Sequence, residues 1–119
     1  TDQADVERET EVLGYRTLFA DRIHGAVGDA TKEAKRIVLE RIMDSIGADA
    51  QQRIITFGDG PVEMRETHKR GGFAVGIASD EVRRYGWNDA KRRRLIEAGA
   101  DIIIPDFSQH EWLLALLFP

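Results

Sequence analysis

The sequence contains no cysteine and no long apolar run, and these absences exclude several classes of protein. Without cysteine there is no disulfide and no thiolate metal site, so we expect an intracellular protein and predict a cytoplasmic location. The longest apolar stretches, IIIP and WLLALLF, are far shorter than the ~18 residues that a membrane-spanning helix needs. The first residues, TDQADVERETEVLG, are acidic and polar, unlike a secretion signal. We therefore expect no association with a membrane.

An excess of positive charge is also missing. The chain has 17 Lys and Arg against 21 Asp and Glu, a net charge of −4, so no overall field attracts nucleic acid. The basic run KRRR, 91–94, falls within an expected helix whose Leu95 and Ile96 are predicted to face the core, and we interpret the run as a solvated helix face. The three histidines are widely separated and lack metal-ligand spacing. The sequence therefore predicts no nucleic-acid partner.

What is present is a regular alternation of strand-like and helix-like segments in one expected domain, 1–119. Apolar and β-branched residues predict three strands, at 53–57, 73–79 and 101–107. Polar and periodic segments between them predict helices, at 5–13, 32–46, 61–70, 79–86 and 88–99, with an apolar helix or tail at 110–118. Asn88 is the expected cap at the start of the helix 88–99, and Gly99 is expected to end it. Strands of this kind separated by helices are typical of a parallel sheet covered on both faces. We predict an α/β, Rossmann-like, three-layer α/β/α fold.

An aspartate and a glutamate lie four residues apart where the strand 53–57 turns into the next helix. Asp59 follows the strand, Gly60 lets the backbone turn, Pro61 begins the helix, and Glu63 falls in its first turn. Functional residues of this architecture lie at the carboxyl ends of the strands, so we expect both carboxylates on the same side. Such oxygen donors suit Mg²⁺.

The same two residues also have a purely structural interpretation. Aspartate before Gly-Pro is common in turns. A glutamate in a first helical turn gains about 0.3 to 1 kcal/mol from the helix dipole without any metal. From the spacing alone, this structural role is favoured.

A longer pattern resembles the haloacid dehalogenase-like (HAD) hydrolase superfamily, in particular its phosphoglycolate-phosphatase-like members. The segment ITFGDGPVEM resembles the family's fourth motif, Gly-Asp-x-x-x-Asp after a parallel strand. The segment RIHGAVGDATKEAKRIVLERIM before it, and the segments FAVGIASDE and GADIIIPDFSQ after it, fall in the order expected of these members. The resemblance extends from about Tyr15 to Gln109 and implies a HAD-like core.

The resemblance also implies roles for three residues. The first acid of the fourth motif helps to bind Mg²⁺ in the family and corresponds to Asp59. The second position holds Glu63 in place of the commoner aspartate, with an implied role as a more distant ligand or as a partner of the family's lysine. That lysine, which stabilises the nucleophile and the phosphoryl charge, corresponds to Lys35 rather than Lys32, because the apolar pattern after Lys35 keeps the family's register.

Three parts of the family's pattern have no counterpart in this chain. There is no Asp-x-Asp-Gly, whose first aspartate is the family's nucleophile, no Ser or Thr at the tip of the neighbouring strand, and no cap, which largely selects the substrate. The resemblance thus implies the C-terminal part of a HAD-like core, from a Mg²⁺-dependent phosphatase that acts on a small phosphate ester through an aspartyl-phosphate. Because phosphoryl transfer needs nucleophile and metal together, we expect the chain alone to be inactive and to bind Mg²⁺ weakly.

The alternative is a non-catalytic HAD-like module, either appended to another enzyme or mediating protein interaction. In either case the strand 53–57 is expected to lie at an exposed edge of the sheet, where it could pair with a second copy or with a missing N-terminal half. A small phosphorylated substrate is the expected ligand of the complete protein.

Overall fold

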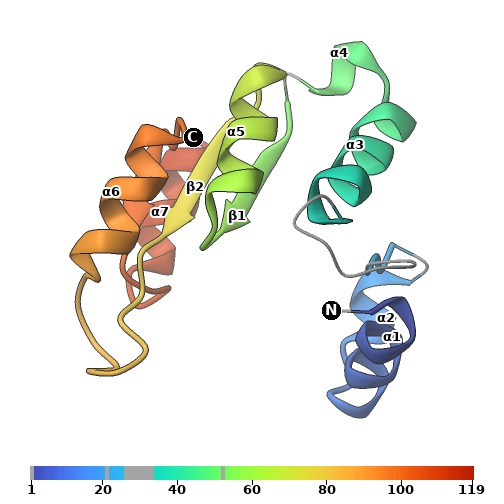
Figure 1. Cartoon of the computed structure of the whole chain (residues 1–119), viewed down its shortest axis with the longest axis horizontal. Helices are drawn as coiled ribbons and strands as arrows, with labels where there is room; N and C mark the ends of the chain where they lie inside the picture. Colours follow the sequence, from blue (N-terminus) through green and yellow to red (C-terminus); the bar gives the residue numbers. More distant parts are fainter. Residues whose placement is uncertain (1, 21, 26–33, 52) are drawn as a thin grey trace. The chain divides into compact units, whose positions relative to one another are not determined.

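The computed structural model describes residues 2–20, 22–25, 34–51 and 53–119 (Figure 1). By its internal contacts the chain divides into two compact units, Thr1–Gly47 and Ala48–Pro119, which are described separately below. The expectation of a single domain over 1–119 stays a prediction. No helix within the described ranges is long and apolar enough to cross a membrane.

The first unit contains helices α1 (Gln3–Val12), α2 (Arg16–Phe19) and α3 (Ala34–Ile46). Helix α1 begins where Asp2 accepts a hydrogen bond from the backbone N–H of Ala4, as an N-cap residue does. Helix α3 lies within the helix predicted at 32–46; residues 32 and 33 are outside the described part. The apolar periodicity of this segment therefore identified the helix correctly.

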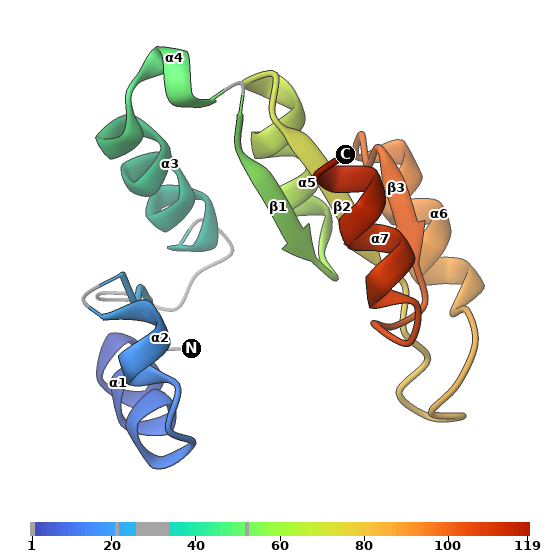
Figure 2. The ribbon, with the colours of Figure 1, turned by 180° about the vertical axis from the view of Figure 1, so that it is seen from behind.

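The second unit is a three-stranded parallel sheet with crossover helices, which confirms the predicted Rossmann-like α/β fold. The strands lie in the order β1-β2-β3. Helices α5 and α6 cover one face of the sheet and α7 covers the other (Figures 1 and 2). The elements are α4 (Ala48–Gln51), β1 (Ile55–Gly58), α5 (Pro61–Lys69), β2 (Phe73–Ile77), α6 (Asp89–Glu97), β3 (Ile102–Ile104) and α7 (His110–Leu117).

Small residues in the central strand let α6 approach the sheet closely. A methyl group on Gly76 would lie 2.8 Å from Ile103 Cδ1 and 3.2 Å from Leu95 Cβ, so this position of β2 has no room for a side chain. Two apolar clusters fill the faces of the sheet. One consists of Met64, Ala74, Ala78, Leu95 and Ala98, and the other of Val75, Ile104 and Leu113. Their burial supplies the main stabilisation of the unit.

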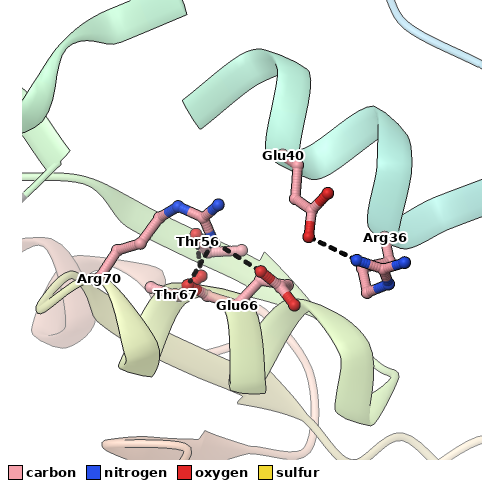
Figure 3. A network of polar contacts seen from close by, with 6 residues as sticks. All are labelled: Arg36, Glu40, Thr56, Glu66, Thr67 and Arg70. Carbon is pink, nitrogen blue, oxygen red and sulfur yellow. Dashed lines mark hydrogen bonds and ion pairs between the residues drawn. The ribbon is translucent and has the colours of Figure 1, made fainter. Parts of the chain in front are cut away.

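Helix α5 is joined to β1 by a polar contact as well as by packing. The Thr67 hydroxyl donates a hydrogen bond of 2.7 Å to the Thr56 hydroxyl (Figure 3). At the C-terminal end of α5, Arg70 forms an ion pair of 2.5 Å with Glu66, and both side chains are largely shielded from solvent. The helix then stops before Gly71, whose φ of +78° suits glycine. Thr56 therefore faces α5, while Ile55 packs on the α7 side of the sheet.

The segment after β2 differs from the prediction of a short helix over 79–86. It forms consecutive turns, because the Asp80 carboxylate accepts hydrogen bonds from the backbone N–H groups of Val82 and Arg83 at 3.1 and 2.8 Å. Arg84 has a left-handed φ of 66°, which a helix does not allow. Ser79 and Trp87 form an isolated antiparallel bridge that closes the loop. The backbone N–H of Arg84 still donates to the Asp80 carbonyl at 2.8 Å, so one turn forms but does not continue as a helix.

Among the exposed apolar side chains of the second unit are those near the edge of β1 and those on α7. Within the described residues β1 pairs only with β2, so its other edge has no partner strand. Phe57 of this strand is partly exposed and lies with its ring centroid 5.9 Å from that of Phe107. Helix α7 directs Leu113 into the core but exposes other large side chains, namely Trp112, Leu114 and Leu116.

Candidate functional site

Four acidic residues follow the carboxyl ends of the three parallel strands. Asp59 follows β1, Asp80 and Glu81 follow β2, and Asp106 follows β3. Because parallel strands all point the same way, these residues leave the sheet at one end, which is where α/β folds place their ligands. The shared direction of the strands therefore makes this end the candidate site.

Asp59 has a partner at this end that the sequence did not predict. Lys91 Nζ lies 3.7 Å from Asp59 Oδ2 and 3.2 Å from Glu81 Oε1. The Lys91 side chain is only 14% exposed, whereas those of Asp59 and Glu81 are 59% and 76% exposed. The interpretation of 91–94 as a solvated face is thus wrong for Lys91, although it holds for residues 92–94, which are exposed. Lys91 instead forms ion pairs with residues that follow two different strands, Asp59 after β1 and Glu81 after β2.

Helix capping explains why Lys91 lies there. The Asn88 side chain caps α6 by accepting a hydrogen bond of 2.9 Å from the backbone N–H of Lys91. The cap places Lys91 in the first turn of α6, and α6 begins at the end of the sheet where the strands β1 and β2 finish. The predicted cap at Asn88 was therefore a usable signal for Lys91, because it fixes which residue of the basic run is nearest to the strand ends.

Glu63 lies in the first turn of α5, as predicted, but its surroundings differ from those of Asp59. Its side chain is buried, with the residue 8% exposed. A methyl group on Gly58 would lie 2.9 Å from Glu63 Oε1, so the carboxylate packs against the last residue of β1. Asp59, in contrast, is exposed and lies beside an ammonium group. The two acids therefore share one strand end but have different environments.

Lys35, the third predicted site residue, is exposed and lies on α3, in the unit Thr1–Gly47. Asp59 and Glu63 belong to the other unit, Ala48–Pro119. The role of Lys35 beside Asp59 stays a prediction.

A hollow of about 240 Å³ lies at the ends of β2 and β3, and Glu81, which pairs with Lys91, is one of its lining residues. Hydrogen bonding from the backbone N–H of Arg83, with further contributions from its side chain, lowers the pKa of Asp80. The hydroxyl and the backbone N–H of Ser108 lower the pKa of Asp106. Both acids are therefore charged near neutral pH. The hollow is lined by Ser79, Asp80, Glu81, Arg84, Tyr85, Gly86, Pro105 and Asp106.

The described residues do not by themselves fit a bound Mg²⁺. Among them, no three His, Asp or Glu side chains lie close enough together to hold a metal ion. Asp59 is paired with Lys91, and the Glu63 carboxylate lies against Gly58. Mg²⁺ requires near-octahedral oxygen ligands and gives up its water reluctantly. After β1, this end of the sheet thus offers one accessible carboxylate, that of Asp59, next to a competing cation.

Comparison with known proteins adds no relative. No family model matches the chain, and neither the curated proteins nor the solved structures include a significant match. The fold and the strand-end geometry are therefore the observations on which a function can be based. Together they establish a small α/β domain in which three parallel strands alternate with helices.

Proposed function

We propose that this chain is the C-terminal part of a HAD-like hydrolase, a Mg²⁺-dependent phosphatase that acts on a small phosphate ester through an aspartyl-phosphate. One observation supports the proposal most. Asp59 projects from the carboxyl end of a parallel strand, and Glu63 lies in the first turn of the helix that follows. This is the arrangement that the resemblance to the fourth HAD motif implies.

In this proposal Asp59 supplies one oxygen ligand on the metal side of the site. Glu63 supports that strand end from its buried position against Gly58. Lys35 is assigned to stabilisation of the phosphoryl charge. The nucleophile and the remaining metal ligands would come from a part of the protein that this chain does not contain, which accords with the incomplete set of ligands around Asp59. No catalytic step is therefore derived for the chain alone.

The exposed edge of β1 is the proposed place where the missing part joins. Within the described residues this edge has no partner strand, and unpaired backbone groups favour pairing with another strand. Either an N-terminal half or a second copy of the chain could supply that strand.

The proposal is tested with the longest natural polypeptide that contains this sequence. Phosphate release from small phosphate esters is measured with and without Mg²⁺ for the wild type, Asp59→Asn and Asp49→Asn. Asp49 lies on α4 and is exposed, so its variant removes the same charge outside the candidate site. We expect Mg²⁺-dependent turnover that falls by roughly 100-fold or more in Asp59→Asn only. Equal turnover in the two variants would refute the assignment.

A second candidate function is a non-catalytic interaction module. It is favoured by α7, because a helix that is apolar all round is normally buried by a neighbour. Trp112, Leu114 and Leu116 are all exposed on this helix. The upstream sequence separates the candidates: Asp-x-Asp-Gly there supports the hydrolase, and a long upstream region without it supports the module.

A further inference from the structure

The protein has two tryptophans, Trp87 and Trp112, and both line one cavity in the second unit. The cavity has a volume of about 230 Å³ and lies beyond the carboxyl end of β3, where Pro105 and Asp106 also line it. Trp87 directly precedes the cap of α6, whereas Trp112 belongs to the first turn of α7. The fold therefore brings together two indoles that lie far apart in the sequence.

Both tryptophans stand on well-anchored parts of the unit. Trp87 pairs with Ser79 in the isolated antiparallel bridge. Trp112 is followed on α7 by Leu113, which is buried in the core together with Ile104. Leu113 and Ile104 also line the cavity, so its floor is the core itself. A ligand would therefore bind to walls that are already in place and would lose little free energy in ordering them.

The charge of the lining favours a cation over an anion. Of the described residues that line the cavity, Asp106 is the charged one, and its carboxylate accepts a hydrogen bond of 2.9 Å from the backbone N–H of Ser108. The faces of an indole carry negative electrostatic potential, and tryptophan is the aromatic residue that attracts cations most strongly. A carboxylate beside two indoles thus complements a positively charged organic group.

Arg92 already places one cation over the Trp87 ring. Its guanidinium carbon lies 5.7 Å from the ring centroid, within the range of a cation–π contact. Arg92 does not line the cavity, so it leaves the cavity open to a ligand. Its positive charge nevertheless opposes a second cation near the same ring, and we therefore expect weak binding, at millimolar concentrations of ligand.

The size and polarity of the cavity narrow the class of cation. Sites for drug-sized ligands usually have volumes of about 300 to 1,000 Å³, so this cavity suits a smaller group. Ile104, Pro105 and Leu113 give it apolar walls besides the indoles. A primary ammonium would lose hydrogen bonds to water against such walls, whereas a methylated ammonium has none to lose and packs its methyl groups against them.

We propose that this cavity binds the methylated ammonium group of a small organic cation, with Trp87 and Trp112 as its aromatic walls and Asp106 as the opposing charge. The inference goes beyond the proposed function, because none of these three residues has a part in the proposed phosphatase chemistry. It can therefore fail or succeed without regard to that function.

The first test is titration of the full 119-residue chain with choline, followed by tryptophan fluorescence. The comparison ligand is neohexanol, the uncharged carbon isostere of choline, and sodium chloride keeps the ionic strength constant. Free N-acetyltryptophanamide corrects for effects on any indole. We expect a saturable change with choline at an affinity about fivefold or more above that for neohexanol. Equal affinities would show a merely apolar cavity, and no saturable change with choline would show that the cation does not bind; either result overturns the proposal.

Variants locate the site. Trp112→Leu and Asp106→Asn should each weaken choline binding by about threefold or more, and Trp87 still reports on binding in both. Phe118→Leu removes an exposed aromatic ring at the end of the same helix, and Asp49→Asn removes an exposed carboxylate on α4; neither residue lines the cavity. These controls should change the affinity by less than about twofold. Circular dichroism verifies that each variant is folded. Losses as large in the controls as in the cavity variants would contradict the assignment.

A further measurement uses the wild-type chain alone and so does not depend on whether a variant folds. In nitrogen–proton NMR spectra, the indole N–H signals of Trp87 and Trp112 should both shift with choline and give the same dissociation constant. A shift of one signal alone would overturn the shared cavity. Ethanolamine, the primary-amine analogue, should bind more weakly than choline; equal or tighter binding would overturn the assignment of a methylated ammonium group.

Discussion

Replacing Leu95 by alanine tests how α6 packs on the sheet. Leu95 is fully buried and belongs to the cluster formed with Met64, Ala74 and Ala78. Truncating a buried leucine to alanine costs about 2 to 5 kcal/mol, because apolar contacts are lost and a cavity remains. Leu95 on α6 already lies close to Gly76 of β2, so the helix and the strand have little freedom to move together and close the cavity. We therefore expect a loss of stability in the upper half of the range of about 2 to 5 kcal/mol. A whole domain is stable by only about 5 to 15 kcal/mol.

The assay is urea unfolding followed by tryptophan fluorescence, and both tryptophans, Trp87 and Trp112, lie in the same unit as Leu95. Ile96→Ala is the matched control. The sequence placed both residues in the core, but Ile96 is 50% exposed, so its truncation should cost less than about 1 kcal/mol.

Leu95→Met serves as a second variant if Leu95→Ala does not fold. A swap that conserves volume should cost less than about 1.5 kcal/mol and should leave the chain folded. If Ile96→Ala were as destabilising as Leu95→Ala, α6 would have to pack on the sheet with a different face, and the described core would be wrong.

Three further predictions follow from the strand end and the sheet edge. The isolated chain should not hydrolyse phosphate esters in the presence of Mg²⁺, because it lacks the family's nucleophile; turnover that persists through purification and disappears in Asp59→Asn would contradict this. The chain should dimerise through the edge of β1 or bind its N-terminal half, as judged by light scattering over a wide concentration range. A thermally stable monomer that binds no hydrophobic dye would count against it. The pKa of Asp80 in the folded chain lies below its ordinary value of 3.8, so the carboxylate stabilises its loop above that pH and loses this contribution as the pH falls through the lower value. Carbon-13 NMR of the carboxyl group should show this titration below pH 3.8, and Asp80→Asn should loosen the loop at pH 7; a normal pKa would refute the described hydrogen bonds.

The sequence predicted most of the sheet and its helices because their signals are local. Apolar, β-branched stretches gave three strands whose positions agree with β1, β2 and β3, although the observed strands are shorter. Asn88 and Gly99 correctly marked the ends of α6; Asn88 caps its start, and Gly99 has a φ of +102° just beyond its last turn. The predicted helix at 79–86 was wrong because hydrogen bonds to Asp80 formed turns that composition alone does not reveal.

The candidate site was only partly predictable. The position of Asp59 after a strand could be predicted, because the end of a strand is visible in the sequence. The contact with Lys91 could not, since it joins residues 32 positions apart and depends on how α6 packs across the sheet. The composition of the four-residue basic run does not distinguish the shielded lysine from its three exposed neighbours, although the position of the Asn88 cap does.

The most direct test of the central claim is the rate of phosphate release by the longest natural polypeptide that contains this sequence. The rate is measured with saturating Mg²⁺ for the wild type and for Asp59→Asn, with Asp49→Asn as the charge-matched control. The proposal predicts Mg²⁺-dependent release in the wild type and in Asp49→Asn, and a loss of roughly 100-fold or more in Asp59→Asn. Release that is undiminished in Asp59→Asn, or no release from a polypeptide that carries an upstream Asp-x-Asp-Gly, would contradict it.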